Sequence, residues 1–228
     1  MDRRLLLPLV AMLVAGPAAD AAETVPQFGS AASLERPRGA PRGSIILMPG
    51  GDGRLGIRPD GTITSLLGNQ LVRTRQAYAA RGFATLTLDA GGSPAQAVQY
   101  MRSIARPVVV VATSRGATRA PAALSARPDG MVLTSAMLDV FQSYAGAPGA
   151  LPPTLVVHHR QDGCRVSLPA LVEPFVAWAG GRARVVWLSG GIDRGDPCQA
   201  AGHHGFAGLD AQVVAQVSAF AGSLRGRR

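Results

Sequence analysis

Ser114, Asp162 and His204 have the types and the order that could turn a hydroxyl group into a nucleophile. A serine hydroxyl attacks poorly on its own, and a histidine that accepts its proton makes the attack possible. A carboxylate beside the histidine fixes the imidazole tautomer and stabilises the imidazolium that forms. We therefore expect Ser114 to be a nucleophile, Asp162 its supporting acid and His204 the general base, a combination typical of acyl transfer.

Ser114 stands where a strand is expected to turn sharply into a helix. Four valines at 108–111 precede it, a helix-compatible stretch from Arg115 to Leu124 follows, and small residues, Ala112 and Gly116, flank it at two positions. This pattern predicts a nucleophile elbow, whose tight turn lifts the serine oxygen clear of the sheet edge. Glycine is usual where Ala112 stands, but a methyl group is small enough for the turn. A helix N-cap is the alternative role for this serine.

An acyl-transfer site also needs hydrogen-bond donors for the oxyanion that develops during attack. The backbone N–H of Arg115, directly after the serine, is one expected donor. The other is expected from the loop containing Gly50 and Gly51, which follows an early strand and lacks side chains there. Glycine allows the backbone to approach a substrate closely.

Asp162 is the expected acid because it follows directly on an apolar strand at 154–158. In sites with the chain order serine, acid, histidine, the acid lies just beyond a strand, and the histidine lies on a late loop before the last helix. Asp193 and Asp196, on the next loop, are alternative acids.

His204 is the expected base because it directly precedes Gly205-Phe206, at a loop-to-helix corner. Its neighbour His203 is the alternative base. His158 and His159, at the end of the preceding strand, are expected to pack beneath the site, and a substrate contact is their alternative role.

The chain has two cysteines, Cys164 and Cys198. In an exported protein an even pair favours a disulfide, although two buried thiols or a metal site with the histidines are alternatives. If the acid loop and the base loop meet at the sheet edge, this disulfide would join them. The spacing of cysteines and histidines is not that of a metal site, so we expect neither a metal nor a cofactor.

The N-terminus predicts export. Basic residues precede a short apolar run from Leu5 to Ala15, and small residues follow it, so residues 1–21 are expected to form a signal peptide. The run is too short to span a membrane, and an N-terminal anchor is the alternative. We expect 22–43, rich in proline and glycine, to be a flexible leader, 44–228 to be the folded domain, and the protein to be periplasmic or secreted.

The 228 residues suit one domain, and 47% of them are hydrophobic. The chain carries 23 basic residues, all of them arginine, against 14 acidic ones, which gives a net charge of +9. The arginines do not cluster and no aromatic stacking platform accompanies them, so nucleic acid is not an expected partner. A preference for anionic substrates stays open.

Apolar runs alternate with helical patterns along the rest of the chain. Continuous apolar strands are typical of a parallel sheet covered on both faces, and the alternation predicts an α/β layered fold. The expected strands are 44–48, 83–88, 107–113, 130–134, 154–158 and 184–188, and the expected helices are 65–80, 94–104, 115–125, 167–178 and 209–224.

Taken together, these stretches resemble the α/β-hydrolase superfamily, and especially exported bacterial members. The residues that carry the resemblance are 47–53, 68–75, 113–116, 158–164 and 198–206. It implies a mostly parallel sheet flanked by helices, and Ser114, Asp162 and His204 as the triad. The connection at 135–153 is short, so no large lid is expected.

The resemblance implies an esterase acting on small-molecule ester or acyl substrates through an acyl-enzyme. An amidase or peptidase, a dienelactone-type lactone hydrolase, and a non-catalytic binding protein with this fold are the alternatives. The sequence leaves the substrate and the oligomeric state open.

Overall fold

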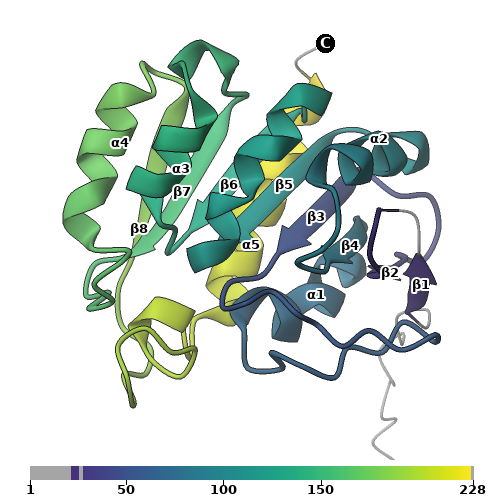
Figure 1. Cartoon of the computed structure of the whole chain (residues 1–228), viewed down its shortest axis with the longest axis horizontal. Helices are drawn as coiled ribbons and strands as arrows, with labels where there is room; N and C mark the ends of the chain where they lie inside the picture. Colours follow the sequence, from purple (N-terminus) through teal and green to yellow (C-terminus); the bar gives the residue numbers. More distant parts are fainter. Residues whose placement is uncertain (1–21, 26–27, 227–228) are drawn as a thin grey trace, which may run out of the picture.

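The computed structural model describes residues 22–25 and 28–226, so the expected signal peptide lies outside the described part. Within that part the chain forms one eight-stranded sheet in the order β1-β2-β4-β3-β5-β6-β7-β8 (Figure 1). The strands from β3 to β8 run parallel, and β1 and β2 are antiparallel additions. The strands are β1 (Glu23–Val25), β2 (Ala32–Glu35), β3 (Ser44–Met48), β4 (Ala84–Leu88), β5 (Val108–Thr113), β6 (Gly130–Thr134), β7 (Thr154–His159) and β8 (Ala183–Leu188).

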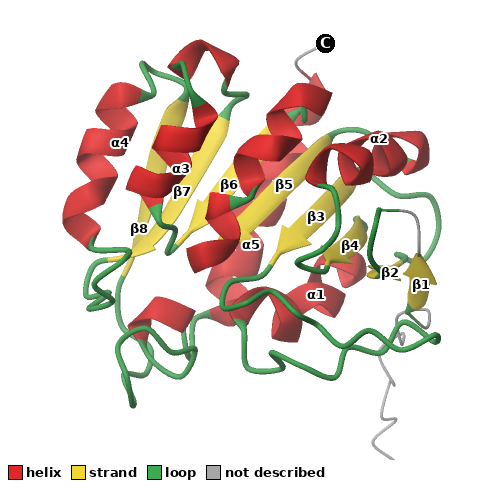
Figure 2. Ribbon diagram, viewed as in Figure 1, coloured by secondary structure: helices red, strands yellow, loops and turns green. Residues whose placement is uncertain are grey.

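Helices cover both faces of the sheet (Figure 2). Residues of α2, α3, α4 and the 3₁₀ helix η2 pack in one core cluster, and residues of α1 and α5 pack in the other. The helices are α1 (Gln70–Ala80), α2 (Pro94–Ile104), α3 (Leu138–Ala145), α4 (Val172–Trp178) and α5 (Asp210–Ser223). The 3₁₀ helices are η1 (Ser114–Thr118), η2 (Ala120–Ala126), η3 (Pro148–Ala150), η4 (Pro169–Leu171), η5 (His203–Gly205) and η6 (Leu224–Gly226).

The central strands are buried along their whole length. Successive residues of β5 alternate between the two cores: Val108 and Val110 pack on one side, Val109 and Val111 on the other. Both faces therefore demand apolar side chains, which explains the unbroken valine run. The predicted α/β arrangement, with a mostly parallel sheet between helices, is confirmed.

The segment 22–43 has more structure than the sequence predicts. β2 pairs with β4 and β1 pairs with β2, both antiparallel. Ala32 and Leu34 of β2 are fully buried against the sheet. The expectation of a leader with little structure was wrong for these strands, because each is too short for its pattern to stand out among the neighbouring prolines and glycines.

The helix expected after Ser114 is two 3₁₀ helices, η1 and η2, that meet at Arg119. Pro121 lies in the first turn of η2. Because proline has no backbone N–H, the bond that would continue an α-helix across this junction cannot form.

Two further differences concern α1 and α3. The expected helix at 65–80 begins only at Gln70, where Asn69 caps it by accepting a 3.1 Å hydrogen bond from the Leu71 N–H. The connection at 135–153 contains α3, which has eight residues and is too short for its apolar spacing to predict a helix. This connection is still too small to form a lid.

No described helix combines the length and the apolar character needed to cross a membrane.

Candidate active site

The backbone around Ser114 has the geometry of a nucleophile elbow. Ser114 follows the last residue of β5 and has φ +50°, a left-handed conformation that is strained for a residue with a side chain. A Cβ added at Gly116 would lie 2.2 Å from the Met48 carbonyl oxygen and 2.7 Å from that of Pro49. The turn therefore packs directly against the end of β3, and only glycine fits at position 116.

Ala112 occupies the position where this fold usually has glycine. It is fully buried in β5 and is paired in register with Met48 on one side and Leu133 on the other. The strand pairing thus continues through the alanine, and the methyl group is part of the core. The elbow keeps its conformation with Ala112 in place.

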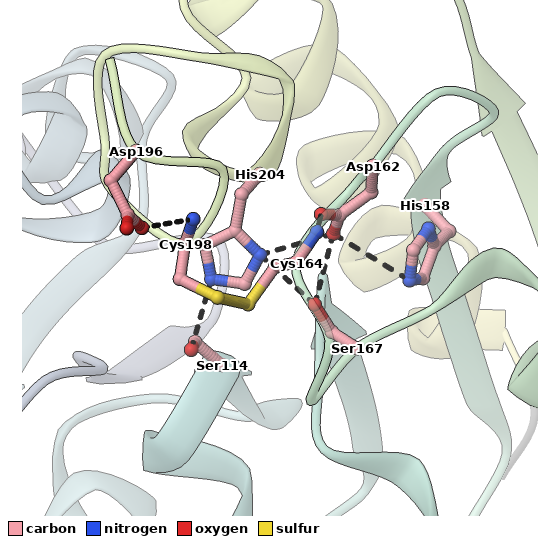
Figure 3. The surroundings of a disulfide bond; sticks show 8 residues. All are labelled: Ser114, His158, Asp162, Cys164, Ser167, Asp196, Cys198 and His204. Carbon is pink, nitrogen blue, oxygen red and sulfur yellow. Dashed lines mark hydrogen bonds and ion pairs between the residues drawn. A yellow bond between two sulfur atoms is a disulfide. The ribbon is translucent and has the colours of Figure 1, made fainter.

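The structure brings Ser114, His204 and Asp162 into one line of hydrogen bonds (Figure 3). Ser114 Oγ lies 3.0 Å from His204 Nε2, and His204 Nδ1 lies 3.0 Å from Asp162 Oδ2. The serine follows β5, the aspartate follows β7, and the histidine lies in η5 before α5. If Nδ1–H donates to the carboxylate, Nε2 is free to accept the serine proton.

Asp162 is buried yet held in its ionised form. Burial alone would raise its pKa, but the hydrogen bond and the electrostatic attraction from His204 outweigh burial and hold the pKa below its ordinary value. The Cys164 N–H adds a 2.9 Å hydrogen bond to Oδ1. The carboxylate is therefore charged at neutral pH and can orient the imidazole.

Ser167 is a member of this cluster that the sequence analysis missed. Its hydroxyl lies 3.0 Å from Asp162 Oδ2 and 3.0 Å from His204 Nδ1, and the residue is fully buried. Nothing in the sequence distinguishes it from an ordinary turn serine, because its role depends on a loop that folds back onto the acid.

His158 and His159 lie beneath the site, as expected. Burial lowers the pKa of His158, so it is neutral, with Nδ1 3.1 Å from the His159 carbonyl oxygen. Its Nε2 is 3.9 Å from Asp162 Oδ2. The His159 ring stacks on that of His203, with 4.1 Å between the ring centroids.

The alternative acids and the alternative base are engaged elsewhere. His203 Nδ1 lies 3.2 Å from the Gln161 carbonyl oxygen and 3.6 Å from Asp193 Oδ2. Asp196 accepts a 2.8 Å hydrogen bond from the Cys198 N–H within its own loop. The geometry therefore favours Asp162 and His204 over these alternatives.

A disulfide between Cys164 and Cys198 joins the loop that carries the acid to the loop that precedes the base (Figure 3). The two Cα atoms are 4.5 Å apart although the residues are 34 positions apart in sequence. The predicted disulfide is present, and it holds together the two loops that meet Ser114.

The glycine loop after β3 lies against the nucleophile. A Cβ at Gly50 would be 2.9 Å from Ser114 Cβ and 3.5 Å from Ser114 Oγ, so the bare backbone is what allows the approach. Gly51 has φ +66°, which favours glycine. Gly51 and Arg115 both line the cavity in front of the serine.

This cavity has a volume of about 500 Å³ and opens onto Ser114 and His204. Asn69, Gln70 and Met137 contribute to its wall, and its charged lining residues are Asp52, Arg115 and Arg165. Within the described ranges, no three His, Cys, Asp or Glu side chains are grouped to hold a metal ion. The cavity has room for a small organic molecule in contact with Ser114 and His204.

Solved structures share this architecture at low sequence identity. A serine hydrolase homologue from Coxiella burnetii matches with a TM-score of 0.57 and 14% identity over 93% of this chain and 100% of that chain. A brefeldin A esterase, a bacterial homologue of human hormone-sensitive lipase, matches with a TM-score of 0.64 and 15% identity over 99% and 81%. A serine hydrolase without a lid from Xanthomonas campestris matches with a TM-score of 0.59 and 13% identity over 90% and 95%. No protein-family model and no curated protein matches the sequence.

Proposed function

Since the chain has the α/β-hydrolase fold, we propose that it is a serine hydrolase that cleaves carboxylic esters through an acyl-enzyme on Ser114. The observation that carries this proposal is the line of hydrogen bonds from Ser114 through His204 to Asp162, which ends at a cavity. Fold alone does not imply function, so the proposal depends on this geometry.

In the first step Ser114 Oγ attacks the ester carbonyl carbon while His204 Nε2 accepts the hydroxyl proton. The carbonyl oxygen becomes an oxyanion, stabilised by the N–H of Arg115 and one N–H from the Gly50-Gly51 loop. The carbon–oxygen bond to the alcohol then breaks, and His204 gives its proton to the leaving oxygen. The acyl group remains on Ser114, and Asp162 has stabilised the imidazolium throughout.

In the second step water takes the place of the alcohol. His204 accepts a proton from the water as the water oxygen attacks the acyl carbon, and it returns that proton to Ser114 as the acid product leaves. Ser114 and His204 thereby return to their starting protonation states. Apart from the ester and the water, each group that takes part in these steps belongs to the described part of the chain.

Esters are favoured over amides and lactones because the similar solved structures include the brefeldin A esterase. The lack of a large insertion between β6 and β7 leaves the cavity without a lid, which suits small, accessible esters.

We further propose that residues 1–21 are a signal peptide and that the mature enzyme is periplasmic or secreted. The disulfide supports this location, because disulfides persist in oxidising compartments.

A fluorophosphonate probe tests the activated serine directly. We expect the purified protein to be labelled at Ser114 and the label to be lost in Ser114→Ala and strongly reduced in His204→Ala. Ser125→Ala is the matched control, since Ser125 is exposed on η2 and outside the cavity. Absence of labelling in a folded, disulfide-bonded protein would refute the proposal and favour a non-catalytic binding protein.

A further inference from the structure

Two arginines line the cavity in front of Ser114, and both guanidinium groups are unengaged. In the described part of the chain, neither the Arg115 nor the Arg165 guanidinium group has a hydrogen bond or an ion pair with another residue. Arg73 and Arg75, on the neighbouring helix α1, instead pair with carboxylates at 2.7 Å. Unpaired arginines also occur elsewhere on the surface, so the location of these two, beside the nucleophile, is the informative feature.

Arg165 is carried by a turn whose two ends are fixed. The Ser167 N–H donates a 3.0 Å hydrogen bond to the Cys164 carbonyl oxygen, which places Arg165 and Val166 at the two corner positions of a β-turn. Cys164 is fully buried in the disulfide, and Ser167 is fully buried against Asp162. The corner residues both line the cavity, so the backbone of Arg165 has a fixed place relative to the site.

Arg115 reaches the same cavity from the elbow itself. It directly follows Ser114, and its carbonyl oxygen accepts a 2.9 Å hydrogen bond from the Thr118 hydroxyl. This hydrogen bond involves the backbone of Arg115 and leaves its guanidinium group unpaired. The side chain remains available to a bound molecule.

The charge of the cavity lining is positive. Asp52 is the lining residue of opposite sign, and its Oδ1 accepts a 3.0 Å hydrogen bond from the Arg54 N–H in its own loop. Two arginines against one aspartate, on a chain with a net charge of +9, attract anions into this space. A guanidinium group donates two parallel hydrogen bonds to a carboxylate. A neutral ester lacks the charged pair of oxygen acceptors that this arrangement requires.

We propose that Arg165, assisted by the side chain of Arg115, binds an anionic group of the substrate, so that the preferred esters carry a carboxylate. This inference rests on the proposed ester hydrolysis at Ser114. The carboxylate belongs to either the acyl part or the alcohol part of the ester, and the probes below separate the two positions.

Two pairs of esters test the proposal, each pair differing only in a free or methylated carboxylate. In the acyl pair, mono-4-nitrophenyl adipate is compared with its methyl ester. In the alcohol pair, 4-acetoxybenzoate is compared with methyl 4-acetoxybenzoate. After division by the uncatalysed rates, we expect kcat/KM to favour the anionic member of at least one pair by about tenfold, and less so at high salt.

The variants localise this preference. Arg165→Gln is expected to bring the ratio close to one by lowering kcat/KM for the anionic esters, and Arg165→Lys is expected to retain part of the preference. Arg225→Gln removes the same charge from an exposed site outside the cavity and is the matched control. A ratio near one in the wild type, or a ratio that Arg165→Gln leaves unchanged, would overturn the inference.

Failure of the inference and failure of the proposed function give different results. Hydrolysis of the neutral esters that disappears in Ser114→Ala supports the function even if no anion preference is found. If no ester is cleaved, calorimetric titration with 4-acetoxybenzoate and its methyl ester still decides the question. Selective binding of the anion that is lost in Arg165→Gln supports the inference, and equal or absent binding of the two overturns it.

Discussion

The hydroxyl of Ser167 donates its hydrogen bond to the same oxygen of Asp162 that faces the imidazole of His204. The serine therefore braces the acid from the side opposite to the Cys164 N–H, which contacts the other carboxylate oxygen. Ser167 touches neither the nucleophile nor the substrate cavity, so it is a positioning residue that acts through Asp162.

Removal of the Ser167 hydroxyl should lower kcat and leave KM unchanged. We expect Ser167→Ala to lower kcat about tenfold with KM unchanged, because a buried hydrogen bond to a charged group contributes roughly 1.5–3 kcal/mol and the loose carboxylate orients His204 less well. Steady-state kinetics on a neutral ester measures both constants. A fall in thermal stability with an unchanged kcat would show that Ser167 is only structural.

The disulfide should contribute both stability and activity. Cross-linking residues separated by 34 positions is expected to stabilise the fold by about 3–4 kcal/mol, through restriction of the unfolded chain. The paired variant Cys164→Ser/Cys198→Ser should unfold at lower denaturant concentration and lose activity, because the acid loop and the base loop separate more easily. Urea denaturation with and without a reducing agent measures the first effect. Wild-type protein that keeps its midpoint and its activity after full reduction would contradict this expectation.

Glu35 should make the stability depend on pH near neutrality. This fully buried carboxyl of β2 pairs with Arg75 at 2.7 Å, but burial outweighs that attraction and raises its pKa from 4.5 to about 7. The folded state then binds more protons than the unfolded state between these two pH values, so its stability falls as pH rises through this window, by roughly 3 kcal/mol at most.

The variant Glu35→Gln should lack this dependence. We expect the free energy of unfolding of Glu35→Gln, relative to the wild type, to improve steadily between pH 4.5 and pH 7. Chemical denaturation at several pH values measures the difference. Parallel stability curves for the two proteins would show that Glu35 does not titrate in this range.

The elbow should not accept a side chain at position 116. In Gly116→Ala the new Cβ would overlap the Met48 carbonyl oxygen, so β3 and η1 must separate, and we expect loss of folding or a destabilisation of several kcal/mol. Gly149→Ala is the control, since a Cβ there meets no atom within 4 Å. Similar melting temperatures for the two variants would contradict the described packing.

Much of this architecture is predictable from the sequence because its signals are local. The valine run identified β5 to within one residue, and the apolar spacing at 94–104 identified α2. The sequence did not predict β1, β2 and α3, because their stability comes from pairing and packing with distant residues. The 3₁₀ conformation of η1 and η2 was not predicted, because apolar spacing alone does not distinguish it from an α-helix.

The candidate site divides in the same way. Ser114, Asp162 and His204 could be proposed because each follows or precedes a recognisable element in a known order. Ser167 could not, because its part in the site depends on a turn closing back onto Asp162 across five positions. Arg165 was equally hidden, since its place in the cavity depends on the same turn.

The antiparallel strands at the start of the described chain have a consequence for solubility. β2 covers the outer edge of β4, and the three-residue β1, with the exposed Glu23, then forms the border of the sheet. Short, charged borders resist pairing with a second molecule, whereas a long apolar edge invites it. A protein trimmed to begin at residue 44 would present the bare backbone of β4 to its neighbours. β1 and β2 therefore protect the protein from pairing edge to edge with a second molecule.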